Sequence, residues 1–142
     1  PYTTLFRSRI IISPESGSEK SRRINKGFYY TNAQLEHSLD VCKELKINFE
    51  LFFASCLPGD TAEDFLRTLV FARKIKTLHN CKINMETIIP DPCSPIYLND
   101  KQTGMIMGNN DFGSFLSGKN NISAWETAEK RKKYFYAKLG LN

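Results

Sequence analysis

Short apolar runs alternate with longer segments of helical periodicity along most of the chain. Segments 9–13, 47–55 and 81–89 are rich in β-branched and aromatic residues and have the length of strands. The first of them suits a strand that is buried on both faces of a parallel sheet. Segments 32–45 and 61–76 repeat apolar residues at the spacing of one helical face. The order strand, helix, strand, helix, strand predicts two right-handed βαβ units that share their middle strand.

Turn and capping residues mark where these elements begin and end. Pro14 ends the first strand, and a short helix that begins at Ser18 or Glu19 follows it. Segment 57–60 places Pro and Gly at the two central positions of a type II turn. Thr61-Ala-Glu-Asp64 approximates a capping box and therefore predicts the start of the second long helix.

The end of the chain has a weaker pattern, which predicts a loop and one helix. Segment 99–121 is rich in Gly and Asn and is expected to form a long ordered loop. Ser123-Ala-Trp-Glu126 is a capping box that begins a helix ending near Gly140. One face of this helix is expected to pack on the body and the opposite face to lie in solvent. The packed face holds Trp125, Ala128, Lys132, Phe135 and Leu139, and the solvent face holds Lys130, Arg131 and Lys133.

The length of the chain limits the fold. It has 142 residues, of which 41% are hydrophobic, as is typical of a globular domain. A full (β/α)8 barrel takes about 250 residues, so a likeness to a barrel can extend to only part of one. No apolar stretch approaches the ~20 residues of a membrane span and no signal segment opens the chain, so we expect a cytoplasmic protein without a membrane partner. Residues 1–8, PYTTLFRS, resemble a translated sequencing-library adapter and are expected to be non-native.

The net charge of +5 does not come from the body of the chain. Segment 119–142 contains six Lys and Arg residues against two acidic ones, and Arg7 adds one more positive charge. Segment 9–118 holds 13 basic and 13 acidic residues. This balance argues against a nucleic-acid partner for the body.

Cysteines and histidines are spaced too widely for a metal site. They form no C-x-x-C pair, no three-cysteine cluster motif and no pair of histidines on one helical turn. The cysteines are interpreted as reduced thiols that pack as small apolar groups, and the histidines as surface residues. The residues concerned are Cys42, Cys56, Cys81, Cys93, His37 and His79.

Polar residues follow each predicted strand. Parallel α/β sheets and barrels bind ligands at the carboxyl ends of their strands, which here are 14–18, 55–61 and 87–94. Glu15 and Ser16 offer donors and acceptors suited to hydroxyl groups such as those of a ribose. An acidic residue at position 15 also suits an ordinary helix start. The absence of a catalytic triad, a Walker loop and a GxGxxG motif argues against hydrolases and nucleotide kinases.

These three strand ends resemble the radical S-adenosylmethionine (SAM) superfamily, in particular members with a cobalamin-binding domain upstream. The matching segments are Ile12-Ser-Pro-Glu-Ser-Gly-Ser-Glu19 with Ile24-Asn-Lys-Gly27, Phe53-Ala-Ser-Cys-Leu-Pro-Gly-Asp-Thr61, and Glu86-Thr-Ile-Ile-Pro-Asp-Pro-Cys-Ser-Pro-Ile-Tyr97. The resemblance implies an α/β fold in which 9–98 are the C-terminal half of a partial (β/α)6 TIM-like barrel. The remaining 99–142 are then a loop and a C-terminal helical extension.

The resemblance also implies cofactors and a reaction. Members of this superfamily bind SAM and a four-iron, four-sulfur (4Fe-4S) cluster, cleave SAM reductively and transfer a radical to a substrate. The substrate of this protein is unidentified. The family's C-x-x-x-C-x-x-C cluster loop has no counterpart in this sequence. We therefore expect this chain alone to be inactive and to need the N-terminal half of its barrel as a partner. The use of cobalamin is left open.

Site residues follow from the resemblance position by position. The polar group after the first strand would contact the ribose or amino-acid moiety of SAM, and backbone after the other two strands would hold the adenine. Cys56 stands where relatives usually have Gly, so its side chain would narrow the adenine pocket or mark a subgroup. The implied residues are Glu15 and Ser16 after the first strand, Ser55, Cys56 and Leu57 after the second, and Ile88, Ile89 and Pro90 after the third.

Two other interpretations stay open. A non-catalytic α/β module could bind a protein or RNA partner through the basic C-terminal helix. Salt-sensitive RNA binding that is lost when 130–133 are neutralised would support this interpretation. A different barrel enzyme could bind a phosphate at the helix N-terminus that follows 57–60.

Overall fold

The computed structural model of the chain describes residues 9–26, 30–88, 106–107, 121–122 and 125–141. The elements are mixed α/β and follow the predicted order. The strands of the main sheet are β1 (Arg9–Glu15), β2 (Asn48–Ser55) and β3 (Lys82–Thr87). The helices are α1 (Glu19–Lys26), α2 (Asn32–Glu44), α3 (Ala62–His79) and α7 (Trp125–Leu139).

The three strands form a parallel sheet in sequence order, with β2 in the centre. The register places Ile11, Glu50 and Lys82 in one row across the sheet. Ile12 pairs with Leu51 in the next row. Because successive side chains of a strand point to opposite faces, these two rows lie on opposite faces of the sheet.

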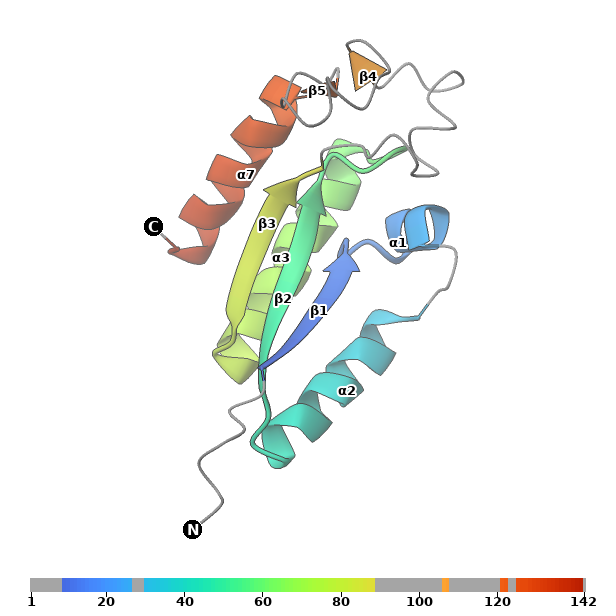
Figure 1. Cartoon of the computed structure of the whole chain (residues 1–142). Coiled ribbons are helices and arrows are strands. Elements are labelled where there is room, and N and C mark those ends of the chain that lie inside the picture. Colours follow the sequence, from blue (N-terminus) through green and yellow to red (C-terminus); the bar gives the residue numbers. More distant parts are fainter. Residues whose placement is uncertain (1–8, 27–29, 89–105, 108–120, 123–124, 142) are drawn as a thin grey trace.

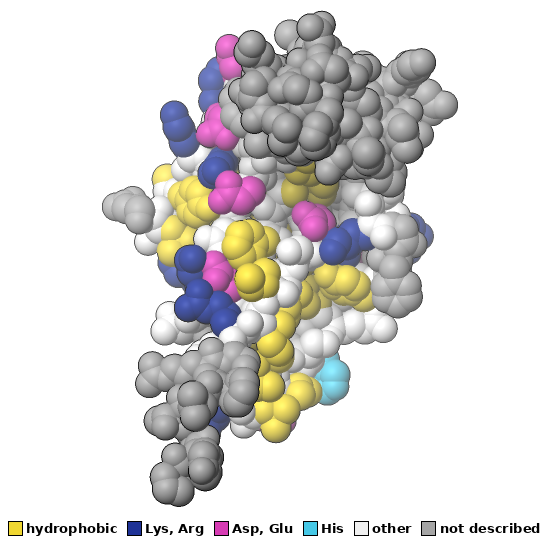
Figure 2. All heavy atoms as spheres, in the orientation of Figure 1, with side chains coloured by type: hydrophobic (Ala, Val, Ile, Leu, Met, Phe, Trp, Pro, Cys, Tyr) yellow, Lys and Arg dark blue, Asp and Glu magenta, His cyan; other side chains and the backbone are white. Residues whose placement is uncertain are grey.

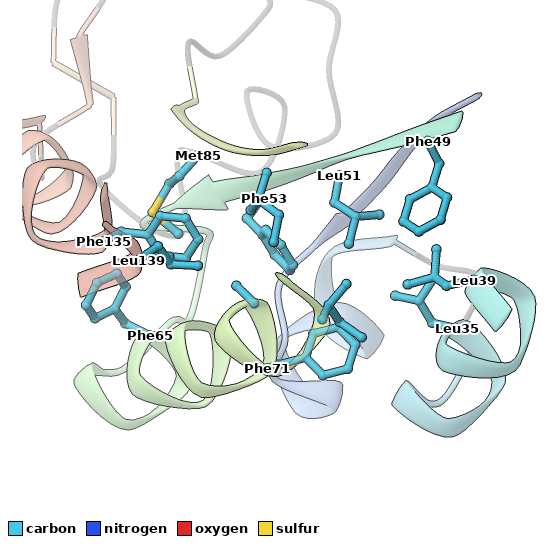
Figure 3. Close-up of a cluster of buried hydrophobic side chains, with 13 residues drawn as sticks. Leu35, Leu39, Phe49, Leu51, Phe53, Phe65, Phe71, Met85, Phe135 and Leu139 are labelled. Atoms are coloured by element: carbon cyan, nitrogen blue, oxygen red, sulfur yellow. The ribbon is translucent and has the colours of Figure 1, made fainter. Parts of the chain in front are cut away.

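Helices cover one of these faces. Figure 1 shows α3 behind the sheet and α2 beside β1, and Figure 3 shows side chains of β2 directed toward both helices. The helix α7 joins the same core through Phe135 and Leu139. Leu51, Phe53 and Met85 fill the centre of this core and are at most 1% exposed. The complete cluster is Leu35, Leu39, Phe49, Leu51, Phe53, Phe65, Phe71, Ala72, Ile75, Ile83, Met85, Phe135 and Leu139.

The opposite face of the sheet is open, in that no helix among the described residues covers it. This open face looks toward the viewer in Figures 1 and 2, and hydrophobic and charged side chains share it. The prediction that the first strand is buried on both faces is wrong. β1 lies at the edge of the sheet, and Ile10 and Ile11 are 39% and 62% exposed. A β-branched sequence can indicate a strand but cannot indicate which neighbours cover it.

Helix boundaries follow local capping. Thr61 and Asp64 form the predicted capping box at the start of α3. The helix then continues past Lys76 to His79, because Asn80 supplies the left-handed cap (φ 48°) that ends it.

The C-terminal helix packs largely as predicted. Ala128 and Phe135 are fully buried and Leu139 is 7% exposed. The prediction that Arg131 points into solvent is wrong, because Nη1 of Arg131 lies 3.4 Å from Sγ of Cys56. The helix passes the end of β2, so the Arg131 side chain is half-buried there.

The two histidines lie in different environments, and the three described cysteines are all at least partly buried. His37 is exposed, as predicted. The prediction of a surface position for His79 is wrong: its side chain is 2% exposed and its ring packs edge-on against Phe49 at 5.7 Å. Its place in the last turn of α3, beside the start of β2, explains this burial. Cys42, Cys56 and Cys81 are free thiols and are buried or half-buried, which agrees with their interpretation as packing groups.

Some predictions concern residues outside the described part of the chain. They include the adapter-like 1–8, the end of the third predicted strand with 90–98, Cys93, the side chain of Trp125 and most of the loop 99–121. Within that loop region, β4 (Ile106–Met107) and β5 (Asn121–Ile122) form a short antiparallel pair that the sequence did not indicate. No helix in the described ranges is long and apolar enough to cross a membrane.

Candidate functional site

Two neighbouring strands end in a left-handed residue that is not glycine. Glu15 at the end of β1 has φ 63°, and Cys56 just after β2 has φ 59°. Each such residue costs of order 1 kcal/mol in backbone strain, and strain of this kind concentrates at functional sites. The carboxyl edge of the sheet is therefore strained at two of its strand ends.

The loop after β1 is fastened to α3 by serines and a glycine. The Ser16 hydroxyl lies 3.0 Å from Oγ1 of Thr68, and the Gly17 N–H donates to the same oxygen at 2.9 Å. A Cβ on Gly17 would lie 2.7 Å from Cα of Thr68, so only glycine permits this approach. The Ser18 hydroxyl donates to Asp64 at 2.6 Å.

A buried arginine holds the same loop from the other side. Arg22 is fully buried and donates from Nη2 to the Ser16 carbonyl at 2.8 Å and to the Asn32 side chain at 2.6 Å. Its Nη1 donates to the Tyr30 carbonyl at 2.7 Å. Sequence reasoning missed this residue, because no local pattern distinguishes a buried arginine of a short polar helix from an exposed one.

Two carboxylates at the start of α3 have opposite pKa shifts. Burial raises the pKa of Asp64, but hydrogen bonds from Ser18 and Thr61 and the ammonium of Lys20 outweigh it and hold the pKa at about 2. Burial also raises the pKa of Asp60, and there it dominates over the hydrogen bond from Ser21. The first carboxylate is thus a fixed anion that anchors the loop after β1.

The helix N-terminus after 57–60 is already satisfied within the chain. Thr61 and Asp64 exchange hydrogen bonds between side chain and backbone, at 3.0 Å and 3.2 Å. The first turn of α3 also carries Glu63 and Asp64. A phosphate at this helix end would face these carboxylates, which is unfavourable.

The end of β2 is closed to side-chain contacts with a ligand. Ser55 is fully buried and donates to the Ala128 carbonyl at 3.0 Å, and Leu57 is 4% exposed. Cys56 is 7% exposed, and its thiol has Ser55 and Arg131 as polar neighbours, neither of which is a general base. Only backbone groups of 55–57 could serve a ligand here.

The end of β3 contacts α7. The Thr87 hydroxyl donates to Glu129 at 2.6 Å, and Ile88 is half-buried. Ile89 and Pro90 lie outside the described residues, so their predicted role stays a prediction. Arg131 and Glu129 were missed as members of this edge, because their distance in sequence from the strands hides the contact.

Glu15 is a predicted site residue whose side chain is accessible. Its side chain is 32% exposed, and its carboxylate lies 3.6 Å from Nζ of Lys26. Ser16, by contrast, is 1% exposed and its hydroxyl serves Thr68 and the Ser18 N–H. The edge thus joins one accessible carboxylate, a positioning serine and the backbone around Cys56, while the ligand contacts themselves stay predictions.

The basic run of α7 does not form one face. Lys132 pairs with Glu86 at 2.6 Å, and Lys130 lies 3.9 Å from Glu126. The Arg131 guanidinium lies over the Phe65 ring, 5.4 Å from its centroid. Several of these charges are therefore engaged within the chain, which weakens the interpretation of this helix as a partner-binding module.

Residues suited to a metal cluster do not gather in the described part of the chain. No group of three or more His, Cys, Asp and Glu side chains there could hold a metal ion. Cys42, Cys56 and Cys81 lie on or beside three different elements. These residues do not fit a 4Fe-4S cluster.

Comparison with known proteins adds no assignment. No protein-family model matches the chain, and no curated protein matches it.

Proposed function

We propose that this chain is the C-terminal half of the barrel of a radical SAM enzyme, whose parent protein cleaves SAM and transfers a radical to an unidentified substrate. The proposal rests on the sequence motifs at three strand ends together with the arrangement of the sheet. In this proposal the cluster ligands and the preceding strands belong to other parts of the parent protein.

The observation that carries the proposal is the winding of the sheet. Strands β1, β2 and β3 are adjacent in sequence order, and their helices lie on one face. A barrel keeps one strand order and one helical face throughout, and each half of a doubly wound sheet does the same over three strands, so the winding agrees with the barrel that the three motifs indicate. The open face of this sheet then corresponds to the interior of the barrel.

The two edges of the sheet support the same interpretation. The outer edge of β3 is closed by Tyr136, whose hydroxyl accepts from the Met85 N–H at 2.9 Å and donates to the Met85 carbonyl at 3.1 Å. The edge of β1 has no strand beside it among the described residues. Further strands can therefore add at β1, where the N-terminal half of a barrel would continue, but not at Met85 of β3.

The backbone at Cys56 supports the motif match at the end of β2. Its φ of 59° is a conformation that glycine adopts at little cost and other residues rarely adopt. This explains in physical terms why relatives would carry glycine there. The cysteine keeps the same turn, and its thiol contacts Arg131.

The proposed roles of the chain's own residues follow from their accessibility. The Glu15 carboxylate accepts hydrogen bonds from hydroxyl groups of SAM, and backbone groups of 55–57 and 88–90 face the adenine. Ser16 acts as a positioning residue, since its buried hydroxyl fixes the loop that carries Glu15. SAM, when bound, supplies the 5′-deoxyadenosyl group of the reaction.

The first experiment is to sequence the coding DNA upstream of Arg9 and to express the longer reading frame. We expect an in-frame C-x-x-x-C-x-x-C after a strand-like segment. After anaerobic iron–sulfur reconstitution, the longer protein should release 5′-deoxyadenosine from SAM under reduction, whereas the 142-residue chain should show no cluster absorbance. A reading frame without that motif, or cluster binding by the short chain, would overturn the proposal.

A variant of the longer protein tests the proposed carboxylate. Glu15→Gln should raise the KM for SAM roughly tenfold, because a charged acceptor is replaced by a neutral one. Glu63→Gln is the matched control, since that side chain is 71% exposed on α3 and pairs only with Arg67 among the described residues. Equal kinetics in the two variants would remove Glu15 from the site.

A further inference from the structure

The amino ends of the strands hold a cavity that the proposed function does not use. It has a volume of about 490 Å³ and lies at the end of the sheet opposite to Glu15 and Cys56. Four cations line it: Arg9, Lys43, Lys46 and Lys82. No acidic residue of the described chain is part of this lining. Figure 1 shows this region where α2 and α3 end and β2 and β3 begin.

We propose that this cavity binds a phosphate group. The shared chemistry is that of a phosphate dianion or diester, carried either by a small phosphorylated molecule or by a polynucleotide backbone. The proposal is independent of the radical SAM assignment, because it concerns the other end of the strands and other residues.

The cavity lining contains more cationic side chains than there are described acidic side chains to pair with them. Arg9 and Lys82 share the single carboxylate of Glu50, at 3.0 Å and 2.7 Å. Lys43 donates to the Leu78 carbonyl at 3.0 Å. The Lys46 ammonium has no hydrogen-bond or ion-pair partner among the described residues. Four cations against Glu50 and the exposed Asp40 beside His79 leave a positive excess that attracts an anion.

Two residues of the cavity lining, Lys46 and Asn80, have left-handed backbone. Lys46 ends the helical region after α2 with φ 57°, a conformation usually given to glycine at this position of a helix end. Across the cavity, Asn80 ends α3 with φ 48°. Glycine would adopt either conformation with less strain but would supply no side chain to the cavity.

A lining residue of the cavity contains a buried nitrogen without a described partner. The His79 side chain lines the cavity and is 2% exposed, and its Nδ1 has no hydrogen-bond partner among the described residues. Nε2 of the same ring lies 3.7 Å from Asp40, whose side chain is 61% exposed. Buried polar atoms are nearly always paired in folded proteins, so this nitrogen calls for a partner from outside the described residues.

Phosphate fits this lining better than an isolated carboxylate does. Lysine and arginine residues line it from two strand starts and one helix end, and such donors suit the several acceptor oxygens of a phosphate. The balanced charge of the body argued against a phosphate partner, but folding separates these charges. Acidic side chains of α3 gather at its start, whereas the described lining of the cavity at its other end is basic.

The test is a titration of the full 142-residue chain with inorganic phosphate at constant ionic strength, followed by NMR. The two histidines are built-in probes, since His79 lines the cavity and His37 is exposed on α2. We expect the ring C–H signals of His79 to shift with saturation and those of His37 to stay in place. Equal shifts of both rings, or no shift at tens of millimolar phosphate, would overturn the proposal.

Charge-neutralising variants locate the site. Lys46→Gln should weaken phosphate binding roughly tenfold, because it removes a charged donor that no other described group engages. Lys130→Gln is the matched control, a lysine near the opposite end of the strands that pairs with Glu126. Circular dichroism should show both variants folded. Unchanged phosphate affinity in Lys46→Gln would contradict the proposal.

A second titration distinguishes the two sources of phosphate. Single-stranded RNA should displace inorganic phosphate and shift His79 with a strong salt dependence if the natural ligand is a polynucleotide. If RNA binds no tighter than inorganic phosphate, the source is a small phosphorylated molecule. Either outcome retains the phosphate site, whereas RNA binding that leaves His79 unshifted and is lost in Lys130→Gln would place the anion site on α7 instead.

Discussion

The two faces of the sheet are built by different forces. On the covered face, Leu51 and Phe53 pack into an apolar core that three helices complete. On the open face, the corresponding row contains Ile11, Glu50 and Lys82, held by ion pairs and hydrogen bonds. A single strand, β2, therefore places buried apolar side chains on one face and a charged side chain on the other. Stability should therefore respond very differently to changes at adjacent positions.

The largest expected effect lies on the covered face. Phe53→Ala should lower the free energy of unfolding by about 3–5 kcal/mol, since it leaves a cavity among fully buried aromatic rings. Phe53 is 1% exposed and lies 6.4 Å from Phe71 and 6.1 Å from Phe135 between ring centroids. Urea denaturation measures the loss. Phe52→Ala on the open face is the control, and an equal loss there would break the distinction between the faces.

A smaller but distinct effect is expected from the carboxylate of the open face. Glu50 is 3% exposed and accepts from Arg9, Lys82 and Asn84. Glu50→Gln should destabilise the chain by about 2 kcal/mol, because the two cations lose their shared anion. Urea denaturation at neutral pH should show almost no effect for the control Glu63→Gln, whose side chain is 71% exposed.

The same carboxylate gives a pH dependence with a defined sign. The hydrogen bond from Lys82 lowers the pKa of Glu50, burial opposes it, and Asn84 and Arg9 add to the lowering. The resulting stabilisation is present above the unfolded pKa of about 4.3 and is lost as the pH falls through the folded pKa. Denaturation midpoints measured between neutral and acidic pH should fall less steeply in Glu50→Gln than in the parent chain. Parallel profiles would show that the ion pairs contribute nothing.

A change at Tyr136 tests how α7 closes the outer edge of β3, where the two faces of the sheet meet. Tyr136→Phe should cost about 1–2 kcal/mol, since the N–H and carbonyl of Met85 lose their shared partner. Tyr134→Phe is the matched control on the same helix, because Tyr134 is 47% exposed. Amide hydrogen exchange at Met85 should accelerate only in the first variant. Unchanged exchange would show that α7 covers the edge without this hydroxyl.

The smallest effect is expected at the exposed position of the open face. Ile11→Thr should change the stability of this chain by less than about 0.5 kcal/mol, since the side chain is 62% exposed. In the longer protein proposed above, the same change should be more costly, because that face would be the barrel interior. Thermal denaturation of both proteins makes the comparison. Equal small effects would argue that the open face stays in water.

Much of the fold could be predicted from the sequence, because capping residues and apolar spacing act between residues that are close along the chain. The capping box of Thr61 and Asp64 and the apolar spacing of α2 and α3 define helices within single turns. The end of α3 was misplaced because Asn80, rather than glycine, supplies the left-handed cap. The exposure of β1 was misjudged because its composition records strand preference and not the presence of neighbours.

The candidate site was predictable in outline and not in detail. Position after a strand end was sufficient to single out Glu15 and Cys56, and both proved to have left-handed backbone. The same reasoning grouped Ser16 with Glu15, although the Ser16 hydroxyl faces Thr68 of α3 and not the open edge. Arg22 and Arg131 carried no local signal. Arg22 is held by loops on either side of its own short helix, whereas Arg131 contacts Cys56 from a distant segment.

By itself, the sequence determined the order of strands and helices, their capping and the polar character of the strand ends. The tertiary structure decided which face of the sheet is covered, which cations surround Glu50 and how His79 becomes buried at a basic cavity. The physical reason is one of range. Periodicity and caps act between residues close in sequence, whereas charge and burial depend on partners that parallel crossovers bring together from distant segments, as Arg9 meets Glu50.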